Sequence, residues 1–595
     1  MILGFLLQAF YATVCAYLLV LAFGGLKVWI AVVSLLAGAF FGVKHARRLH
    51  ALYPDWRFSA FSKGASGLIE IVISVFVLYA AWRHFTWLMF PIENYWATFS
   101  ANNYGDLPLH VNLIRAFSGG IEFPPRNPIF AGELLRYPYG ADLYNALWEI
   151  LGVRLQAHLF VVGMFATFAS LVLLRAFAGW WGIGAFFLNG GLAGWNFLSS
   201  TSALSQQSST EWKNLFLAVF ITQRGMLFAL PLGLMLLILL RGHFSGKKIL
   251  DRRGLAIVGV VWGFLPLFHL HAFVVLSLLI GFMAIEFYGL KGAWRKLLSL
   301  RALQIAFLPA LYFVLFSTDF LRASSAVHWS WVWGKDEGIP LANFLVWNFG
   351  PWLLVPVLIA VLLWQLRRSL EREKLRRLWI EFVTYCGLWL LFFNLMLAPW
   401  DWDNIKVLIW PYLGFARLLY LLFEPLLVKL AGGLEKVVCA LVLFWSGFVT
   451  VGESLRVWPI RTPALYSFAE LARTEGALKQ VPQSAVFAAA PSFNHPLTYF
   501  GRARVAGYAG HLWSHGINGA ETVQKMDQLM KGELSALETV RLAQELGVTH
   551  IFWGPEERRR YNREEAPGKG RLRNVSRVPG YEIYEVSEVP TEGEK

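Results

Sequence analysis

The chain has 595 residues, of which 57% are hydrophobic and only 15% charged. A soluble globular protein rarely combines so many apolar residues with so few charged ones, so that class is excluded. The formal net charge of +15 falls mainly in short loops between apolar runs. Orientation in a membrane explains such loops, and we therefore expect the lipid bilayer, and no nucleic acid, as a partner.

The apolar runs predict an α-helical polytopic membrane protein with about 13 transmembrane helices. The expected spans are 3–23, 27–43, 67–90, 156–175, 178–198, 215–240, 254–269, 272–289, 302–318, 341–363, 380–398, 407–423 and 437–456. Basic clusters lie in the loops 44–63, 241–253, 291–301 and 365–377. By the positive-inside rule these loops are cytoplasmic. The protein is thus expected in the plasma (inner) membrane with its N-terminus in the cytoplasm.

The loop 91–155, between the third and fourth spans, is polar, aromatic and rich in Pro and Gly. It contains Asp106 in the sequence YGDLPLH, followed by His110, Arg126 and Arg136. An Asp before Leu-Pro is often only a turn or helix-cap residue. His110 lies one helical turn after Asp106, so the two side chains are expected on the same face of a helix.

Further polar residues are predicted on the same side of the membrane as this loop, in outer turns or, for Gln223 and Arg224, just inside the span that follows. They are Gln223 and Arg224, His269 and His271, and the group Asp401, Asp403, Asn404 and Lys406 in WDWDNIK. Each span carries the chain to the other side of the membrane. The number of spans between these residues, rather than a sequence motif, therefore places them on one side. Scattered polar groups that meet at one membrane surface predict a single extracytoplasmic site.

Several of these residues have two interpretations. His269 and His271 could hold a divalent cation, Mg²⁺ or Mn²⁺, with Asp106 and Asp403, but lone HxH and DxD matches are weak evidence for a metal. The tryptophans near 400–402 are typical of an interfacial belt and could also stack on a sugar. Arg224 and Arg417 fall within predicted spans, where each could face a cavity or a phosphate, or extend from a helix end to the membrane surface.

Residues 457–595 differ in composition from the membrane domain 1–456. Short apolar strands at 484–489, 548–553 and 581–586 alternate with polar helices at 521–531 and 535–546. This pattern predicts a small C-terminal extracytoplasmic α/β domain. Its stretch GRARVAGYAGHLWSHG contains Arg502, Arg504, His511 and His515, which could form a second polar site or a compact glycine-rich loop.

With Asp106 in the first large external loop, the chain resembles the GT-C class of membrane glycosyltransferases. The amphipathic segments 107–117 and 141–151 are similar to the membrane-parallel helices of that class, and the C-terminal domain is similar to the soluble domain of many members. The resemblance implies a sugar donor linked to a polyprenyl phosphate, and an acceptor hydroxyl on a glycan, lipid or protein.

In the expected mechanism Asp106 is the general base that removes the proton of the acceptor hydroxyl. His110 orients the base or the acceptor, and cations such as Arg126, Arg224 and Lys406 balance the charge on the leaving phosphate. A single displacement inverts the anomeric centre. Protein cations suffice for this leaving group, so no metal is required.

The alternative function is a transporter or flippase of a lipid-linked saccharide, which would use a similar outer cavity. Such a protein should carry internal repeats and polar residues through the full depth of the membrane. The cytoplasmic halves of the predicted spans are mostly apolar, which favours chemistry at one face. A third possibility is a scaffolding or receptor-like protein whose C-terminal domain carries the function.

Overall fold

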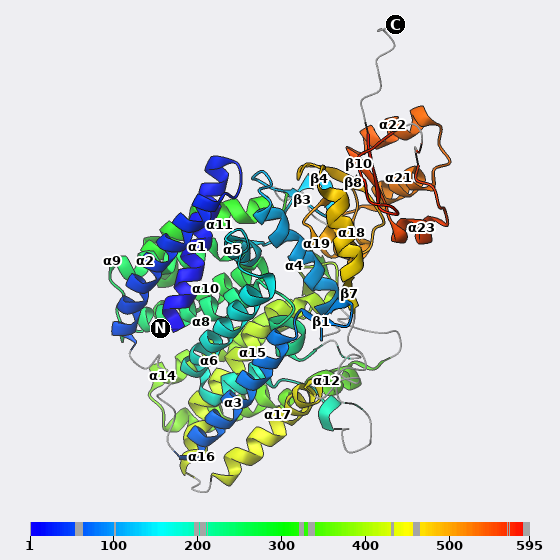
Figure 1. Ribbon diagram of the computed structural model, residues 1–595. Coiled ribbons are helices and arrows are strands. Elements are labelled where there is room, and N and C mark those ends of the chain that lie inside the picture. Colours follow the sequence, from blue (N-terminus) through cyan, green and yellow to red (C-terminus); the bar gives the residue numbers. More distant parts are fainter. Residues whose placement is uncertain are drawn as a thin grey trace. The chain divides into compact units, whose positions relative to one another are not determined.

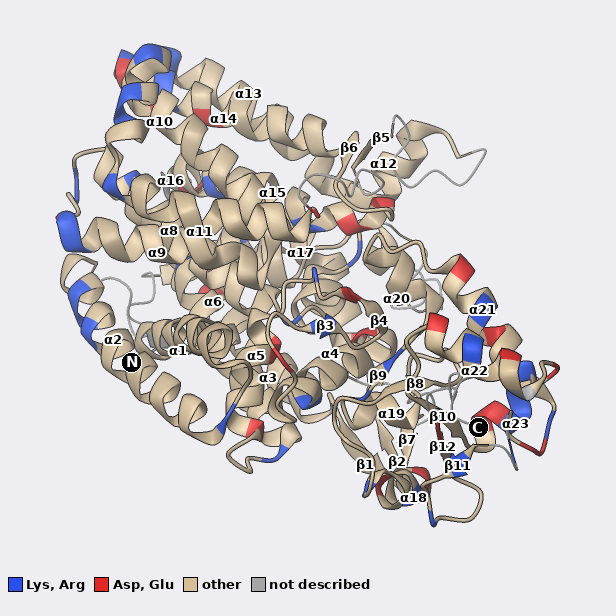
Figure 2. Cartoon of the chain, turned by 90° about the horizontal axis from the view of Figure 1, so that it is seen from above, with Lys and Arg blue, Asp and Glu red and all other residues tan. Residues whose placement is uncertain are grey.

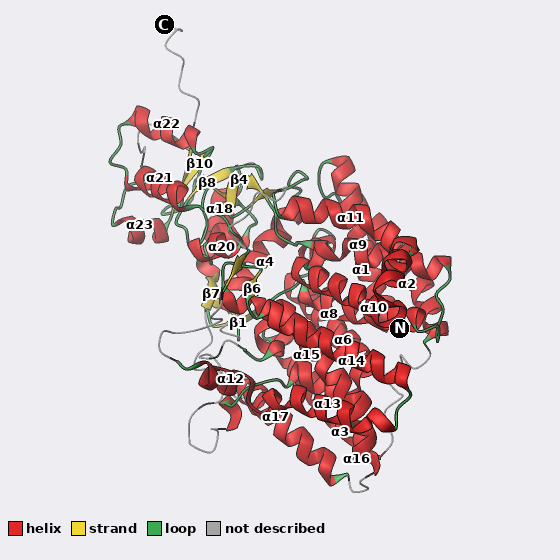
Figure 3. Ribbon diagram, turned by 180° about the vertical axis from the view of Figure 1, so that it is seen from behind, coloured by secondary structure: helices red, strands yellow, loops and turns green. Residues whose placement is uncertain are grey.

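The computed structural model is mainly helical, with few strands (Figure 1, Figure 3). It describes residues 2–53, 64–99, 103–195, 202, 210, 212–319, 327–330, 339–429, 433–455, 464–567, 569 and 572–586. Within these residues, nine helical segments are long and apolar enough to cross a bilayer. The chain is therefore a helical multi-pass membrane protein, as the sequence predicts.

The predicted count of 13 spans is not confirmed, and four of the predicted spans account for the difference. The spans 156–175 and 178–198 correspond to one kinked helix, α6 (Leu155–Phe187), with non-helical backbone at Ala178 and Gly179. Two others, α9 (Arg252–Phe268) and α11 (Arg301–Ser317), have 17 residues each. At about 1.5 Å per residue they fall short of a hydrocarbon core of about 30 Å. The fourth, α14 (Arg372–Phe392), begins with a charged stretch.

The chain divides into two compact units, and the division falls within α1 (Ile2–Phe23), α2 (Val28–Leu52) and α6. Unit 1 comprises 1–11, 37–86 and 159–461, and unit 2 comprises 12–36, 87–158 and 462–595. The other apolar helices of unit 1 are α3 (Gly64–Thr86), α8 (Met226–Phe244), α10 (Leu270–Ser299), α12 (Leu341–Phe349), α13 (Leu354–Gln365), α15 (Ile405–Leu422) and α17 (Leu434–Ser454). The predicted boundary at 456 lies outside the described residues and stays a prediction.

Unit 1 carries its basic loops at one end of its helices (Figure 2). Arg48 of the first basic loop pairs with Asp251 of the second. The second and third loops are within electrostatic range through His243 and Lys296. Arg376 of the fourth loop donates a hydrogen bond to the carbonyl of Glu286 on α10, at 3.0 Å. The described parts of the first three loops thus lie together, and the fourth contacts α10 shortly before the third loop, as the positive-inside argument requires. Residues 54–63 of the first loop lie outside the described residues.

Glycines let α17 approach the segment that follows α6. A Cβ atom on Gly447 would lie 2.0 Å from the carbonyl oxygen of Leu188, and one on Gly191 would lie 1.9 Å from that of Trp347. Because both obstacles are backbone, neither contact can be relieved by a side-chain rotation. A methyl group at either position would therefore push two chain segments apart.

We expect Gly447→Ala to lower the free energy of unfolding of the detergent-solubilised protein by about 1–3 kcal/mol, the usual cost of overpacking. The control is Gly452→Ala in the same helix, where a Cβ atom would meet nothing within 4 Å. That variant should be unchanged or slightly stabilised, because Ala favours the helix over Gly. Thermal unfolding followed by tryptophan fluorescence compares the two, and equal melting temperatures would contradict this packing argument.

Unit 2 combines residues from both ends of the sequence. A three-stranded antiparallel sheet has the order β1 (Phe90–Ile92), β2 (Tyr95–Ala97) and β7 (Ala464–Ser467). Two helices follow in the first loop, α4 (Asn103–Ser118) and α5 (Gly140–Glu149), and the hairpin of β3 (Arg126–Asn127) and β4 (Phe130–Leu134) joins them. They correspond to the predicted amphipathic segments 107–117 and 141–151.

The C-terminal part of unit 2 is built on a mixed five-stranded sheet. Its order is β11 (Arg573–Asn574), β12 (Glu582–Glu585), β10 (His550–Trp553), β8 (Val486–Ala488) and β9 (Ala503–Arg504). The helices are α18 (Phe468–Leu478), α19 (Pro496–Tyr499), α20 (Ala509–Ser514), α21 (Ala520–Lys531), α22 (Ala536–Glu545) and α23 (Pro555–Tyr561). The three predicted strands match β8, β10 and β12, and the two predicted helices match α21 and α22.

Both faces of this sheet are covered by helices, and successive side chains of β10 point to opposite faces. Ile551 and Trp553 pack with residues of α21 and α22, whereas Phe552 packs with residues of α18. The capping box of Ser535 and Glu538 starts α22. Local signals of this kind explain why the C-terminal elements could be recognised in the sequence.

Candidate functional site

The predicted centre of the site, Asp106, lies in the first turn of α4 in unit 2, and its side chain is half-buried. The groups that surround this part of α4 come from three segments. We define the α4 cluster as Asp106, His110, Tyr137, Asp142, His511 and His515.

His110 is paired with Asp142. Its Nδ1 atom lies 2.9 and 3.0 Å from the two carboxylate oxygens of Asp142, and both side chains are almost completely buried. A carboxylate on Nδ1 fixes the ring orientation and leaves Nε2 as the remaining polar atom. The sequence predicted the position of His110 relative to Asp106 but not this partner. The sequence feature that could have indicated this partner is Asp142, an acidic residue in the first turn of the amphipathic helix α5.

Residues after the last transmembrane helix contribute to the same cluster. The His511 ring donates a hydrogen bond to the carbonyl of Gly105, the residue before Asp106. The ring of His515 stacks on Tyr137 at 4.6 Å, and Tyr137 in turn lies 6.2 Å from the His110 ring. The predicted second polar site in the C-terminal segment is therefore adjacent to the first, although Arg502 and Arg504 are not part of it. Arg502 and Arg504 bond to backbone carbonyls of the C-terminal segment, Arg504 to Ala490 and Ser492.

The environment of His511 predicts a loss of stability in acid. Burial, and secondarily repulsion by Arg504, lowers the pKa of His511 from 6.5 to about 4. A folded-state pKa below the unfolded value means that stability is complete above pH 6.5 and falls as the pH decreases toward 4. We expect His511→Gln to flatten this dependence, because glutamine keeps a donor for Gly105 without titrating. Melting temperatures of both proteins, measured between pH 7 and pH 4, test this expectation because this interval covers the two pKa values. Parallel curves of melting temperature against pH for the two proteins would contradict it.

The two predicted arginines of this loop have local partners. Arg126 donates a hydrogen bond to the carbonyl of Ala131 at 3.3 Å, across the β3–β4 hairpin. Arg136 lies 3.7 Å from Glu133 and is half-buried. These contacts suit hairpin closure as well as substrate binding, so their predicted substrate-binding role stays a prediction.

In unit 1, His269 and His271 both serve local structure. His269 caps α10, since its Nδ1 accepts a hydrogen bond from the amide of Ala272 at 3.1 Å. His271 donates from Nε2 to the carbonyl of Leu397 at 3.3 Å. His271 is also within electrostatic range of Asp403 and Lys406, so the predicted HLH and WDWDNIK turns do lie together.

The side chains of the WDWDNIK turn are held by neighbouring residues. The amide of Asn404 bonds to the backbone of Phe392, Leu395 and Leu397, with distances of 2.7–2.9 Å, and it is completely buried. This arrangement uses both ends of the Asn404 amide to fix the turn. Lys406 pairs with Asp403 at 3.0 Å, and Asp401 lies 3.6 Å from His328.

Gln223 and Arg224 occupy the turn between the π-helical segment η2 (Phe216–Phe220) and α8, so the predicted span 215–240 is interrupted. A Cβ atom on Gly225 would lie 2.1 Å from the carbonyl of Phe268 and 3.6 Å from His269. The turn thus packs against the HLH turn. Arg224 is 1% exposed, which places its charge in the protein interior.

No group of three or more His, Cys, Asp or Glu side chains is arranged to hold a metal ion within the described residues. The predicted metal ligands are divided between the two units. Asp106 belongs to unit 2, whereas His269, His271 and Asp403 belong to unit 1. That all predicted site residues form one pocket stays a prediction.

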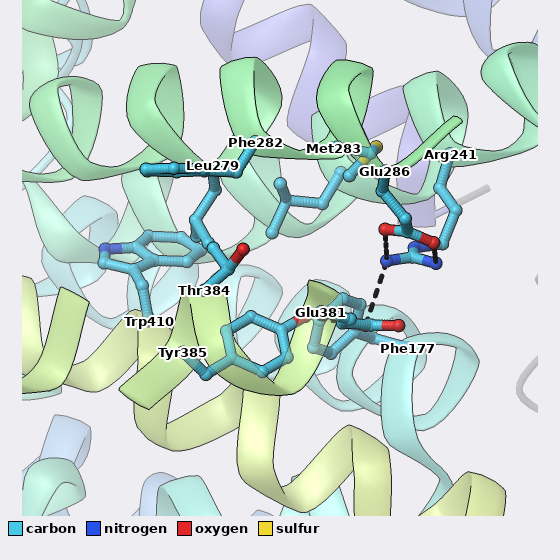
Figure 4. A pocket seen from close by; sticks show the side chains of 11 residues that line it. Phe177, Arg241, Leu279, Phe282, Met283, Glu286, Glu381, Thr384, Tyr385 and Trp410 are labelled. Atoms are coloured by element: carbon cyan, nitrogen blue, oxygen red, sulfur yellow. Dashed lines mark hydrogen bonds and ion pairs between the residues drawn. The ribbon is translucent and has the colours of Figure 1, made fainter. Parts of the chain in front are cut away.

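Sequence reasoning missed a buried ionic network in unit 1 (Figure 4). Arg241 of α8 donates two hydrogen bonds to Glu286 of α10, at 2.9 and 3.0 Å, and lies 2.9 Å from Glu381 of α14. Glu381 also accepts from Tyr385 at 2.8 Å and from Arg417 of α15 at 3.1 Å. The predicted alternative that Arg417 faces a phosphate therefore loses its support. The network borders a cavity of about 20 Å³, enough for about one water molecule.

A second buried ionic group lies at the start of α17. Lys436 pairs with Glu424 at 3.0 Å, and the indole nitrogens of Trp180 and Trp181 donate to the same carboxylate. Both this group and the Arg241 network lie near the ends of helices that adjoin the basic loops. These helices thus carry buried ionisable side chains, and the prediction that the inner halves of the spans are mostly apolar stays a prediction.

Comparison with known proteins does not extend these observations. No family model matches the chain, and no curated protein matches it. What the fold defines is the class of helical multi-pass membrane proteins.

Proposed function

We propose that the chain is an integral-membrane glycosyltransferase that moves a sugar from a polyprenyl-phosphate carrier to an acceptor hydroxyl. The observation that carries the proposal is the half-buried carboxylate of Asp106, placed one helical turn before the buried His110–Asp142 pair. A half-buried carboxylate next to buried imidazoles has the composition of a general-base site. The setting in the plasma membrane, with this site on the outer face, belongs to the same proposal.

In the proposed reaction the acceptor oxygen attacks the anomeric carbon while its proton passes to Asp106. The bond between the anomeric carbon and the phosphate oxygen breaks, and the polyprenyl phosphate leaves with the electron pair. His110, held by Asp142 through Nδ1, orients the acceptor through Nε2. Arg126, in the same unit as Asp106, is proposed to neutralise the leaving phosphate.

The second candidate, a transporter or flippase of a lipid-linked saccharide, gains support from the Arg241 network. Ionisable residues buried between membrane helices often mark a transport pathway. The charges of the network are balanced, however, because two arginines face two glutamates. Such a group also suits a purely structural role.

Detergent-solubilised protein separates the two functions, since a flippase has no membrane to act across in a micelle. The protein is incubated with lipid extract from cells that lack it, and lipid-linked sugars are followed by mass spectrometry. A transferase should consume one lipid-linked sugar and release polyprenyl phosphate. If the extract is unchanged while the same protein moves that lipid in reconstituted vesicles, the glycosyltransferase proposal fails.

A further inference from the structure

An arginine-lined cavity lies in the C-terminal part of unit 2, and none of its residues belongs to the α4 cluster. Its volume is about 550 Å³, within the usual range of small-molecule sites. Four arginines line it, Arg473 from α18 and Arg558, Arg559 and Arg563 from α23 and the loop that follows. The remaining lining residues are Pro555, Asn562, Glu564, Gly580 and Tyr581.

Two of these arginines, Arg558 and Arg563, donate hydrogen bonds to backbone carbonyls. Arg563 donates to the carbonyls of Lys531 and Gly532 at 2.8 and 2.7 Å. A Cβ atom on residue 532 would lie 2.1 Å from the Arg563 guanidinium, so glycine at residue 532 leaves room for the guanidinium. Arg558 donates to the carbonyls of Gly580 and Glu564 at 2.8 and 3.2 Å, and it pairs with the Glu582 carboxylate. A guanidinium has five N–H groups, so both side chains keep donors for a ligand.

The other two arginines, Arg473 and Arg559, are exposed. Among the described residues, no carboxylate lies within ion-pair distance of either one. Arg473 lies over the Tyr581 ring at 5.9 Å, and Glu470 is within electrostatic range of Arg559 without pairing with it. The only acid in the lining, Glu564, lies 3.7 Å from Arg558, and its side chain is 92% exposed. The lining therefore keeps a clear excess of positive charge.

We propose that this cavity binds a sugar phosphate, with the arginines holding the phosphate group. Planar guanidiniums suit phosphate because they donate paired hydrogen bonds to two of its oxygens. A cluster of several guanidiniums matches a doubly charged phosphate better than it matches a ligand with one carboxylate. The volume exceeds that of inorganic phosphate alone and leaves space for a sugar ring. This site takes no part in the proposed transfer reaction and does not depend on it.

Binding to the full-length protein in detergent tests the inference by isothermal titration calorimetry. The probes are glucose 1-phosphate, inorganic phosphate, glucuronate and glucose. We expect glucose 1-phosphate to bind most tightly, inorganic phosphate and glucuronate more weakly, and glucose not at all. The variant Arg473→Gln/Arg559→Gln should weaken binding of glucose 1-phosphate by at least about tenfold, since it removes two charge-assisted contacts.

The matched control is Arg560→Gln in the same run of three arginines. Arg560 faces Asp527 at 3.6 Å and does not line the cavity, so its loss should change the dissociation constant by less than about twofold. Equal weakening in both variants would show only a general charge effect and overturn the site. The absence of binding to either phosphate compound, or preference for glucuronate, would also overturn it. Asp106→Asn should bind glucose 1-phosphate like the wild type, which separates this test from that of the proposed function.

Discussion

Asp106→Asn should abolish most sugar transfer while leaving the protein folded. A general base typically contributes about 10²- to 10⁴-fold to a rate, and asparagine cannot accept the proton of the acceptor hydroxyl. Asparagine is as acceptable as aspartate near a helix N-terminus, so α4 should keep its first turn. The measurement is the initial rate of release of polyprenyl phosphate, together with the melting temperature of the same preparation.

The control for loss of a carboxylate in the same loop is Glu133→Gln. Glu133 lies on β4, its side chain is 40% exposed, and it pairs with Arg136 at 3.7 Å. Its rate should stay within about twofold of the wild type, as expected for a weak surface pair. Near-normal turnover of Asp106→Asn would exclude Asp106 as the base, and similar losses in both variants would point to a loop that is merely sensitive to charge.

Arg241→Ala should cause the largest loss of stability of the variants considered. Removing the guanidinium leaves Glu286 and Glu381 buried with less compensation, and breaking a buried pair in this way costs about 3–5 kcal/mol. Unfolding in mixed micelles by increasing SDS, followed by tryptophan fluorescence, measures the effect.

Two variants make this stability experiment specific. Arg367→Ala removes an exposed arginine from the same end of unit 1, where it lies over the Trp364 ring and donates to the Trp364 carbonyl, and it should cost less than about 1 kcal/mol. Arg241→Ala/Glu286→Gln should recover part of the loss, because it also removes the carboxylate that Arg241 holds with two hydrogen bonds. Equal stability of Arg241→Ala and Arg367→Ala, or no recovery in the double variant, would contradict the proposed energetics of the network.

The membrane class could be predicted from the sequence because it depends on properties of short segments. Length and hydropathy identify a helix that can span a bilayer. Basic residues then mark the loops between spans that are expected on the cytoplasmic side. The described basic loops lie at one end of unit 1, as this pattern requires. The number of spans was less certain, because 17-residue helices and the kink at Gly179 do not follow from hydropathy alone.

Side-chain partners were harder to predict, because they depend on helices that are far apart in the sequence. Arg241, Glu286 and Glu381 come from three helices, and each is a single charge near the end of an apolar run. His110 and Asp142 likewise meet only when α4 and α5 pack together. Asn404 was expected to bind substrate, yet its amide bonds to three backbone groups, a geometry that the letters WDWDNIK do not encode.

The pairing of β2 with β7 has a consequence for biosynthesis. Tyr95 and Ser467 are partners in this sheet, although all the helices of unit 1 from α8 to α17 lie between them in the chain. A ribosome must therefore complete and insert those helices before β7 exists. Until then, nascent β2 has no strand on one edge, and Gly105 has no His511. The candidate base acquires its surroundings only at the end of translation, so a chain truncated by premature termination would not assemble a working centre.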